Sequence, residues 1–190
     1  MNGPIPAARV AWYVTGRFYE TAEGSIQDLG YFLHLEGIRA PLFLEGQPGE
    51  ATALLTFRSD PFKARTVVNG DLSVGLDTVG GFDVYLNRQA GASFEDPDSF
   101  SRGERIARFR RTSVVMGVTL TDPAFSTNVF SADLVASAPF ELGGERFNLR
   151  DLLPGGVTQW GTASANLQPV FAPFSKIVAF VGSAVAGGLR

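Results

Sequence analysis

The chain contains no cysteine, and it has one histidine and two lysines among its 190 residues. Without cysteine, disulfides, thiolate nucleophiles, iron–sulfur clusters and cysteine-rich zinc sites are excluded. A single imidazole, His34, leaves mainly carboxylates as metal ligands, and no metal site is expected. The sequence also has no Gly-x-Ser-x-Gly elbow and no nucleotide-binding glycine fingerprint, so it predicts no cofactor and gives no indication of a serine hydrolase.

Charge is also scarce. Charged residues make up 18% of the chain, against roughly 25% in an average soluble domain, and the formal net charge is −3. The densest basic stretch runs from Arg102 to Arg111 and holds a single aromatic residue, Phe109. Because RNA-binding sheets interleave aromatic and basic side chains on a basic surface, we expect no nucleic-acid partner.

The sequence predicts no membrane segment and no secretory signal. The longest apolar stretch, Ile177 to Leu189, is shorter than the roughly 20 residues of a membrane helix, and glycines interrupt it. The first nine residues lack a basic region followed by an apolar one. We therefore expect a soluble, cytoplasmic protein.

Apolar material is plentiful by contrast. Hydrophobic residues make up 45% of the chain, and 16 of its residues are phenylalanine. A chain of this length most often forms one domain when its strands enclose one core, so we expect a single domain over residues 1–190.

Two segments near the N-terminus read as a hairpin. From Val10 to Glu20 apolar and polar positions alternate, which is typical of a half-buried strand. The turn-like residues Thr21 to Ser25 separate it from a second expected strand, Gln27 to Ile38. On that strand we expect one face to hold Leu29, Tyr31, Leu33 and Leu35.

The rest of the chain repeats short strands separated by turns. Asn69-Gly70 predicts a tight hairpin turn, because these residues accept the positive φ angles of a type I′ turn. The segment 140–147 predicts a hairpin turning at two glycines, and Asn148 to Pro154 a short capped helix. The polar segment 88–103 is interpreted as a surface loop or as the cover of a site. The tail, Phe174 to Leu189, fits a strand or a helix.

The pattern therefore predicts an all-β fold with little helix. Parallel sheets need helical crossovers, which are missing, so the strands are expected to be antiparallel. A barrel is favoured over a sandwich because closure removes the exposed edges of an aromatic-rich sheet. This strand-rich pattern with a closing tail resembles the calycin class and the barrel of allene oxide cyclase-type proteins. The resemblance concerns architecture and transfers no functional residue.

Three residues are candidates for catalysis. On a regular strand His34 shares a face with Phe32 and with Glu36, and it could move a proton for a ligand. The alternative is a structural histidine on the outer face. Asp133 lies in a small, apolar strand, where it is either a site carboxylate or the partner of an arginine across the sheet. Of the candidate arginines, those at 108 and 110 share a face that is opposite to that of residue 111.

The candidate ligand-binding residues combine an apolar body with a polar tip, or carry a cation. They are Trp12, Tyr13, Arg58, Tyr85 and Trp160. All of them fall on expected strands, where they suit the wall of a ligand cavity or an ordinary barrel core.

The favoured hypothesis is a barrel that encloses an apolar small molecule, polyketide-like or terpenoid-like, and acts as a cofactor-independent cyclase or isomerase. Catalysis by shape needs little beyond positioning and one or two proton donors or hydrogen-bond donors. Two alternatives stay open. One is a carrier that leaves the molecule unchanged, and the other is a structural, homo-oligomeric protein whose surplus apolar surface is buried between subunits.

Overall fold

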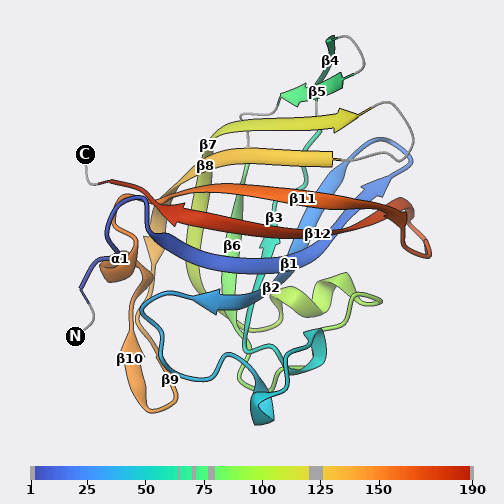
Figure 1. The fold of residues 1–190 in the computed structure, drawn as a ribbon. Coiled ribbons are helices and arrows are strands. Elements are labelled where there is room, and N and C mark those ends of the chain that lie inside the picture. The colour runs from blue at the N-terminus through green and yellow to red at the C-terminus, as the bar shows by residue number, and fades with distance from the viewer. Residues whose placement is uncertain (1–2, 64, 70–71, 77–79, 120–125, 189–190) are drawn as a thin grey trace.

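A computed structural model describes residues 3–63, 65–69, 72–76, 80–119 and 126–188, and its strands all pair in antiparallel fashion. Eight strands close into a barrel (Figure 1). In order around the barrel they are β7 (Glu104–Thr119), β6 (Gly81–Leu86), β3 (Leu55–Ser59), β2 (Ile26–Leu35), β1 (Val10–Thr21), β12 (Phe174–Ala186), β11 (Val157–Leu167) and β8 (Ser126–Ser137). Because β8 pairs back onto β7, the ring is complete. The prediction of an antiparallel, nearly helix-free barrel is confirmed.

Smaller elements decorate the barrel. The hairpin of β4 (Arg65–Asn69) and β5 (Leu72–Leu76) pairs with the far part of β7 and projects beyond the barrel in Figure 1. Its Asn69-Gly70 turn was predicted, but Gly70 lies outside the described residues. The remaining elements are β9 (Phe140–Leu142), β10 (Glu145–Phe147), α1 (Leu149–Leu152) and the 3-10 turns η1 (Leu44–Gly46), η2 (Glu50–Thr52) and η3 (Pro97–Ser101).

Strand β1 follows the predicted alternation. Trp12 and Val14 point into the barrel and are buried, while Tyr13 between them is 47% exposed on the outside. The strand pairs with β2 on one side and with β12 on the other. The ambiguous tail is therefore a strand, β12, and it completes the barrel wall beside β1.

Strand β2 departs from the predicted alternation because it contains a β-bulge. Tyr13 pairs with His34 and Val14 pairs with Phe32, which leaves Leu33 as an extra residue. Phe32 is consequently buried, whereas Leu33 and His34 are both exposed. Leu29, Tyr31 and Leu33 share the expected face, on the outside of the barrel, but Leu35 lies beyond the bulge and points into the core. The expected shared face of His34 and Phe32 was wrong.

Aromatic rings fill the middle of the barrel. Trp12 is 1% exposed, and its indole meets the edges or faces of surrounding rings at centroid distances of 5.5 to 6.4 Å. These rings belong to Phe32, Phe82 and Phe109. Phe82 and Phe109 stack on each other at 4.9 Å. Such pairs contribute beyond the burial of their area, and they make the centre of the barrel a packed core.

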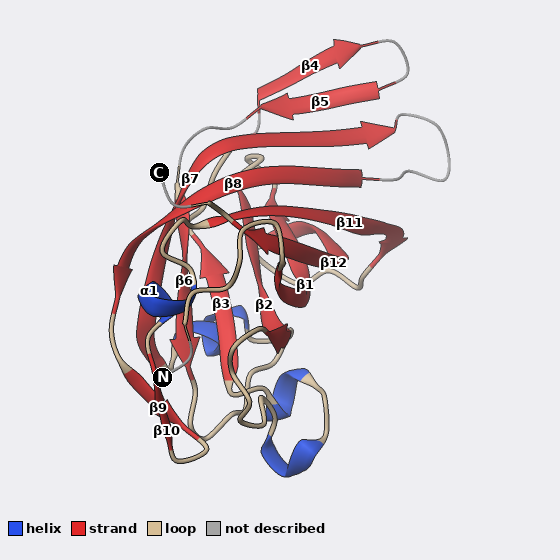
Figure 2. Ribbon diagram, turned by 60° about the vertical axis from the view of Figure 1, so that its left-hand side comes forward, coloured by secondary structure: helices blue, strands red, loops and turns tan. Residues whose placement is uncertain are grey.

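One end of the barrel is closed by α1 and the N-terminal segment (Figure 2). Asn148 caps the helix by accepting a hydrogen bond from the Arg150 backbone N–H at 3.0 Å, as predicted. Ile5 donates its backbone N–H to Leu152 at 2.9 Å, which holds the N-terminal segment against the helix. Leu149 and Leu152 are buried in the barrel core. Any internal site must therefore open toward the other end.

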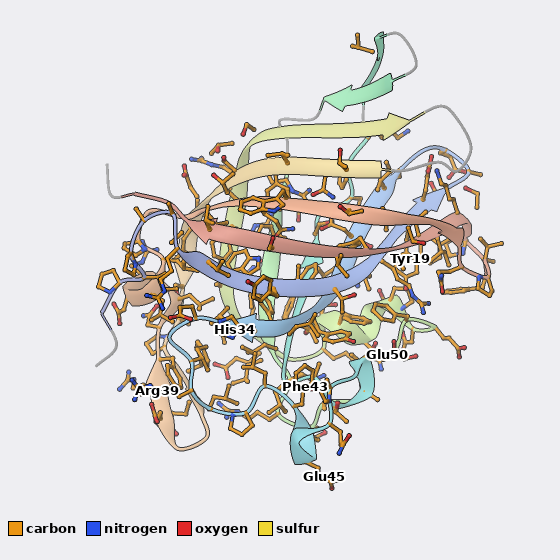
Figure 3. All side chains as sticks on the ribbon, in the orientation of Figure 1. Tyr19, His34, Arg39, Phe43, Glu45 and Glu50 are labelled. Atoms are coloured by element: carbon orange, nitrogen blue, oxygen red, sulfur yellow. The ribbon has the colours of Figure 1, made fainter. Side chains whose placement is uncertain are left out.

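The polar segment 88–103 packs on the outside of the barrel. Phe94 and Phe100 from this segment form a second apolar cluster with Tyr19 and Leu29. The Tyr19 hydroxyl donates to the Phe94 carbonyl at 2.7 Å, and Thr56 donates to the Phe100 carbonyl at 2.7 Å. Figure 3 places Tyr19 on the flank of the barrel wall. The segment thus covers the outer face of β1, β2 and β3.

Tyr19→Phe is expected to make stability less sensitive to alkaline pH. Burial raises the pKa of Tyr19 to about 12, above the 10 of a free side chain. The folded state therefore keeps a proton that the unfolded chain releases, and this stabilisation is complete below pH 10 and lost as the pH rises toward 12. The loss amounts to about 2–3 kcal/mol in the wild-type protein and is absent from Tyr19→Phe. Urea unfolding at several pH values tests this, and parallel pH profiles for the two proteins would contradict it.

Candidate functional site

A buried ion pair crosses the interior of the barrel. Asp28 on β2 and Arg111 on β7 are each 5% exposed, and Arg111 Nη2 lies 2.7 Å from Asp28 Oδ1. A neighbouring hydroxyl, that of Ser59, accepts from the Asp28 backbone N–H at 2.9 Å. Burying two charges removes them from water, and the gain from their attraction often fails to offset that loss. A pair of this kind is therefore a candidate for a functional role.

Two neutral polar side chains extend the ion pair into a cluster. Asn128 on β8 and Gln159 on β11 line the same cavity as Asp28 and Arg111. Gln159 Oε1 accepts from the Trp12 indole N–H at 2.9 Å, which connects the cluster to the aromatic core. We call Asp28, Arg111, Asn128 and Gln159 the interior polar cluster.

Two atoms of this cluster have no hydrogen-bond partner. They are Arg111 Nε, a donor, and Asn128 Oδ1, an acceptor, and both are buried. More than nine in ten buried polar groups in folded proteins are paired, so the unpaired donor and the unpaired acceptor beside one cavity mark the place where a water or another polar group completes their hydrogen bonds. The other such atom among the described residues, Asp83 Oδ1, lies on the outer wall.

Phenylalanine rings surround the polar cluster. The cavity is lined by Phe18, Phe62, Phe130 and Phe180. The Arg111 guanidinium lies 5.0 Å from the centroid of Phe62 and 5.1 Å from that of Phe130. A cation over a ring face is stabilised by the ring's quadrupole. The site therefore combines an apolar wall with a few convergent polar groups, the usual composition of a small-molecule pocket.

Facing glycines make room for these rings. Gly16 on β1 pairs with Gly30 on β2. A Cβ on Gly16 would lie 2.7 Å from the Phe180 ring, and one on Gly30 would lie 2.9 Å from the Phe57 ring. The same Cβ atoms would lie 2.2 Å from the Leu29 carbonyl oxygen and 2.1 Å from the Thr15 carbonyl oxygen, so the glycine pair allows both the close approach of the two strands and the packing of the rings.

The open volume at the site is small. The cavity beside Arg111 offers about 10 Å³, room for about one water molecule. A second hollow of the same size adjoins it and shares Asp28, Phe130 and Gln159. A larger guest must therefore move at least one ring of the lining.

Phe62 is the ring of the cavity lining that lies outside the barrel strands. It belongs to the connection between β3 and β4 rather than to a barrel strand, and it is 8% exposed. Two backbone hydrogen bonds with Ile26, of 2.7 and 2.8 Å, hold it against the start of β2. Its position at the end of the barrel opposite α1 makes it the cover of the interior polar cluster.

Several predicted site residues gather on the outer wall. His34 Nε2 lies 3.3 Å from Glu36 Oε2, and the His34 ring lies 5.8 Å from that of Tyr13. Arg9 lies 3.5 Å from the second Glu36 oxygen. Figure 3 shows His34 on the β2 strand, and its side chain is 46% exposed. The structure thus brings the predicted histidine and glutamate together, but outside the barrel.

Asp133 is also on the outside. Its carboxylate lies 4.0 Å from the Arg110 guanidinium on the neighbouring strand, and both side chains are more than a third exposed. The predicted opposition of the arginines is confirmed, because Arg111 points inward and Arg110 outward. The arginine of functional interest is therefore the inward one.

The predicted ligand-binding residues are divided between the two faces of the wall. Arg58 points outward and binds Asp98 at 2.6 Å, while Tyr85 lies on the adjacent strand 3.5 Å from Asp83. Burial raises the pKa of Tyr85, and the negative charge of Asp83 raises it further. Trp160 is 44% exposed on the outer face, as is Tyr13 at 47%. Of the eight predicted site residues, Trp12 points into the barrel and reaches the interior polar cluster.

None of the four residues of the interior polar cluster was among the predicted site residues, although Arg111 was named as a possible partner of Asp133. A signal existed for two of them. Arg111 breaks the alternation of an otherwise outward arginine series, and Asp28 stands four residues before Phe32, on the same face of a strand. A charged residue on the apolar face of a strand is a sequence mark of a buried ion pair or a site.

No family model matches the chain, and neither the curated proteins nor the solved structures contain a match. Within the described ranges, no group of three or more acidic, histidine or cysteine side chains is arranged to hold a metal ion. The same ranges contain no helix with the length and hydropathy needed to cross a membrane. The interior polar cluster is therefore the feature of the described residues that bears on function.

Proposed function

We propose that the barrel encloses a small, largely apolar molecule and holds one of its oxygen atoms against Arg111. The unpaired Arg111 Nε and Asn128 Oδ1 beside a phenylalanine-lined cavity carry this proposal. A hydroxyl, an enol or a protonated carboxyl group would accept from the first atom and donate to the second. The phenylalanine rings supply the contact for the apolar body.

The same residues support cofactor-free isomerisation or cyclisation. Asp28 removes a proton from a carbon next to the carbonyl of the guest, and the electron pair moves to the carbonyl oxygen. Arg111 stabilises the enolate that forms, since a fixed cation in a dry site acts most strongly where charge develops. Asp28 then returns the proton to a different carbon, which shifts a double bond and consumes no cofactor.

Mass spectrometry of the protein purified without denaturation tests the binding. The wild-type protein and Arg110→Met are expected to carry an additional small-molecule mass that Arg111→Met lacks, because Arg110 is exposed on the outer wall. Asn128→Leu is a second test, since it removes an unsatisfied buried oxygen and should fold well. Identical spectra for all four proteins, each showing the bare chain mass, would contradict binding in the barrel.

Deuterium exchange separates catalysis from carriage. In heavy water, the wild-type protein is expected to incorporate deuterium into the extracted guest, and Asp28→Asn is expected to bind the guest and leave it unlabelled. Asparagine keeps an oxygen for Arg111 but cannot accept the proton. Equal labelling by both proteins would remove Asp28 from the chemistry, and no labelling by either would identify a carrier.

A further inference from the structure

The hydrogen bond to Trp12 fixes the orientation of the Gln159 side-chain amide. Gln159 on β11 is buried, and its Oε1 accepts from the Trp12 indole N–H at 2.9 Å. An indole nitrogen donates and does not accept, so the amide must turn its oxygen toward Trp12. Trp12 is 1% exposed and packed among phenylalanine rings, which hold it in place. The two N–H groups of Gln159 Nε2 therefore lie at the other end of the amide.

This amide nitrogen lies over the inner face of β12. A Cβ on Gly182 would be 3.4 Å from Gln159 Nε2. Gly182 stands two positions after Phe180, so both face the same side of the strand, and the Phe180 ring lines the cavity beside Arg111. The bond to Trp12 is the one hydrogen bond that the Gln159 side chain makes among the described residues. Gln159 Nε2 is thus a hydrogen-bond donor that faces the interior of the barrel.

Gln159 connects the two hollows of the site. It borders both of them, whereas Trp12 borders one and Arg111 borders the other. Because the amide oxygen is bound to Trp12, the amide nitrogen is the end that serves the hollow with Arg111. A guest oxygen at Arg111 Nε would lie in that hollow, which offers about 10 Å³. Donors from two strands, β7 and β11, therefore converge on one small volume.

We propose that Gln159 Nε2 is the second hydrogen-bond donor to the guest oxygen, beside Arg111 Nε, and that Trp12 is the positioning residue that fixes it. This rests on the proposed function, because it concerns the same guest and the same enolate. Two fixed donors aimed at one oxygen form an oxyanion hole, which acts most strongly as negative charge develops there. A carbonyl oxygen has two lone pairs and accepts both bonds. The carboxamide supplies the second donor without adding a charge to the Asp28–Arg111 ion pair.

A pair of variants separates this role from a structural one. Trp12→Phe removes the indole N–H, so the Gln159 oxygen has no indole to bond in that background. Adding Gln159→Met is expected to slow deuterium incorporation into the guest by about 100-fold, because one donor to the enolate oxygen is lost. The guest should remain bound to both variants, as judged by the mass of the protein measured without denaturation.

Urea unfolding of the same two variants provides the contrast. The urea midpoint of the double variant is expected to be no lower than that of Trp12→Phe, because methionine replaces a buried amide that has lost its partner. A side chain with a structural role alone would change stability and leave the labelling rate the same. Equal labelling by the two variants would overturn the role of Gln159 and leave the proposed function standing. Absence of labelling by the wild-type protein would overturn the catalytic part of the proposed function and this assignment with it.

Nuclear magnetic resonance of the wild-type protein tests the contact without a change in the core. With isotope-labelled glutamine, the side-chain N–H signals of Gln159 are expected to move when the guest is removed. Gln27 is the internal control, since its amide donates to the Ser59 carbonyl at 2.8 Å and its oxygen accepts from Arg58 on the outer wall. Gln159 signals that stay as constant as those of Gln27 would overturn the assignment.

Discussion

The free energy of unfolding of the double variant Asp28→Leu with Arg111→Met is expected to be no lower than that of the wild-type protein. Each single substitution is expected to lower that free energy by about 3–5 kcal/mol, because it leaves one buried charge without its partner. Apolar side chains in both positions avoid that penalty and pack against the surrounding phenylalanines. Urea unfolding followed by the fluorescence of Trp12, which lies beside the cluster, measures all three variants.

The double variant also separates function from stability. It should be folded and stable, yet it should lack the bound molecule found with the wild-type protein, because both charged groups of the interior polar cluster are gone. This combination would indicate that the ion pair is retained for binding and not for folding. A double variant that is destabilised by the sum of the two single effects would instead assign the pair a structural role.

Phe62→Ala is expected to open the interior polar cluster to solvent and to small apolar molecules. Removing the ring takes away one wall of the cavity and its contact with the Arg111 guanidinium. We expect the variant to bind a fluorescent apolar probe that the wild-type protein binds weakly, and to lose about 3–5 kcal/mol of stability. Fluorescence titration of the folded protein measures the gain in binding.

Phe147→Ala is the matched control for this prediction. Phe147 is 6% exposed against 8% for Phe62, but it lies on β10 outside the barrel ring, where it packs against Phe140. It should lose a similar amount of stability without gaining probe binding. If both variants bound the probe equally, the gain would reflect loosened packing, and Phe62 would not be the cover of the site.

Local patterns explain why much of the fold could be predicted from the sequence. Alternation over 10–20 identifies β1, and the glycine pair at 143–144 identifies the β9–β10 hairpin. Asn148 marks the start of α1, because its side chain satisfies a free backbone N–H. Each of these features is decided by residues within a few positions of one another, and such information is present in a single sequence.

The candidate site was not predicted because it depends on pairing between distant residues. Asp28 and Arg111 are 83 positions apart, and only the closure of the barrel brings them together. The bulge at Leu33 also made the predicted shared face of His34 and Phe32 wrong, because both Leu33 and His34 point outward. A β-bulge inserts one unpaired residue, and every residue beyond it changes face relative to a regular strand.

Because reactive side chains are scarce, the one histidine was a candidate for catalysis, but the structure places it on the outside of the barrel. His34 pairs with Glu36 at the surface, while the charges inside the barrel belong to common residue types. Arginines are numerous on this strand, and in the sequence Arg111 differs from Arg108 and Arg110 by its facing alone. Burial, rather than rarity, distinguishes the interior polar cluster.

A high-resolution crystal structure of the protein purified without denaturation tests the central claim most directly. We predict electron density for an organic molecule in the barrel, with one oxygen within hydrogen-bond distance of Arg111 Nε and the Phe62 ring displaced. A single isolated water at Arg111 Nε, with every ring of the lining in place in both the wild-type protein and Phe62→Ala, would contradict the account.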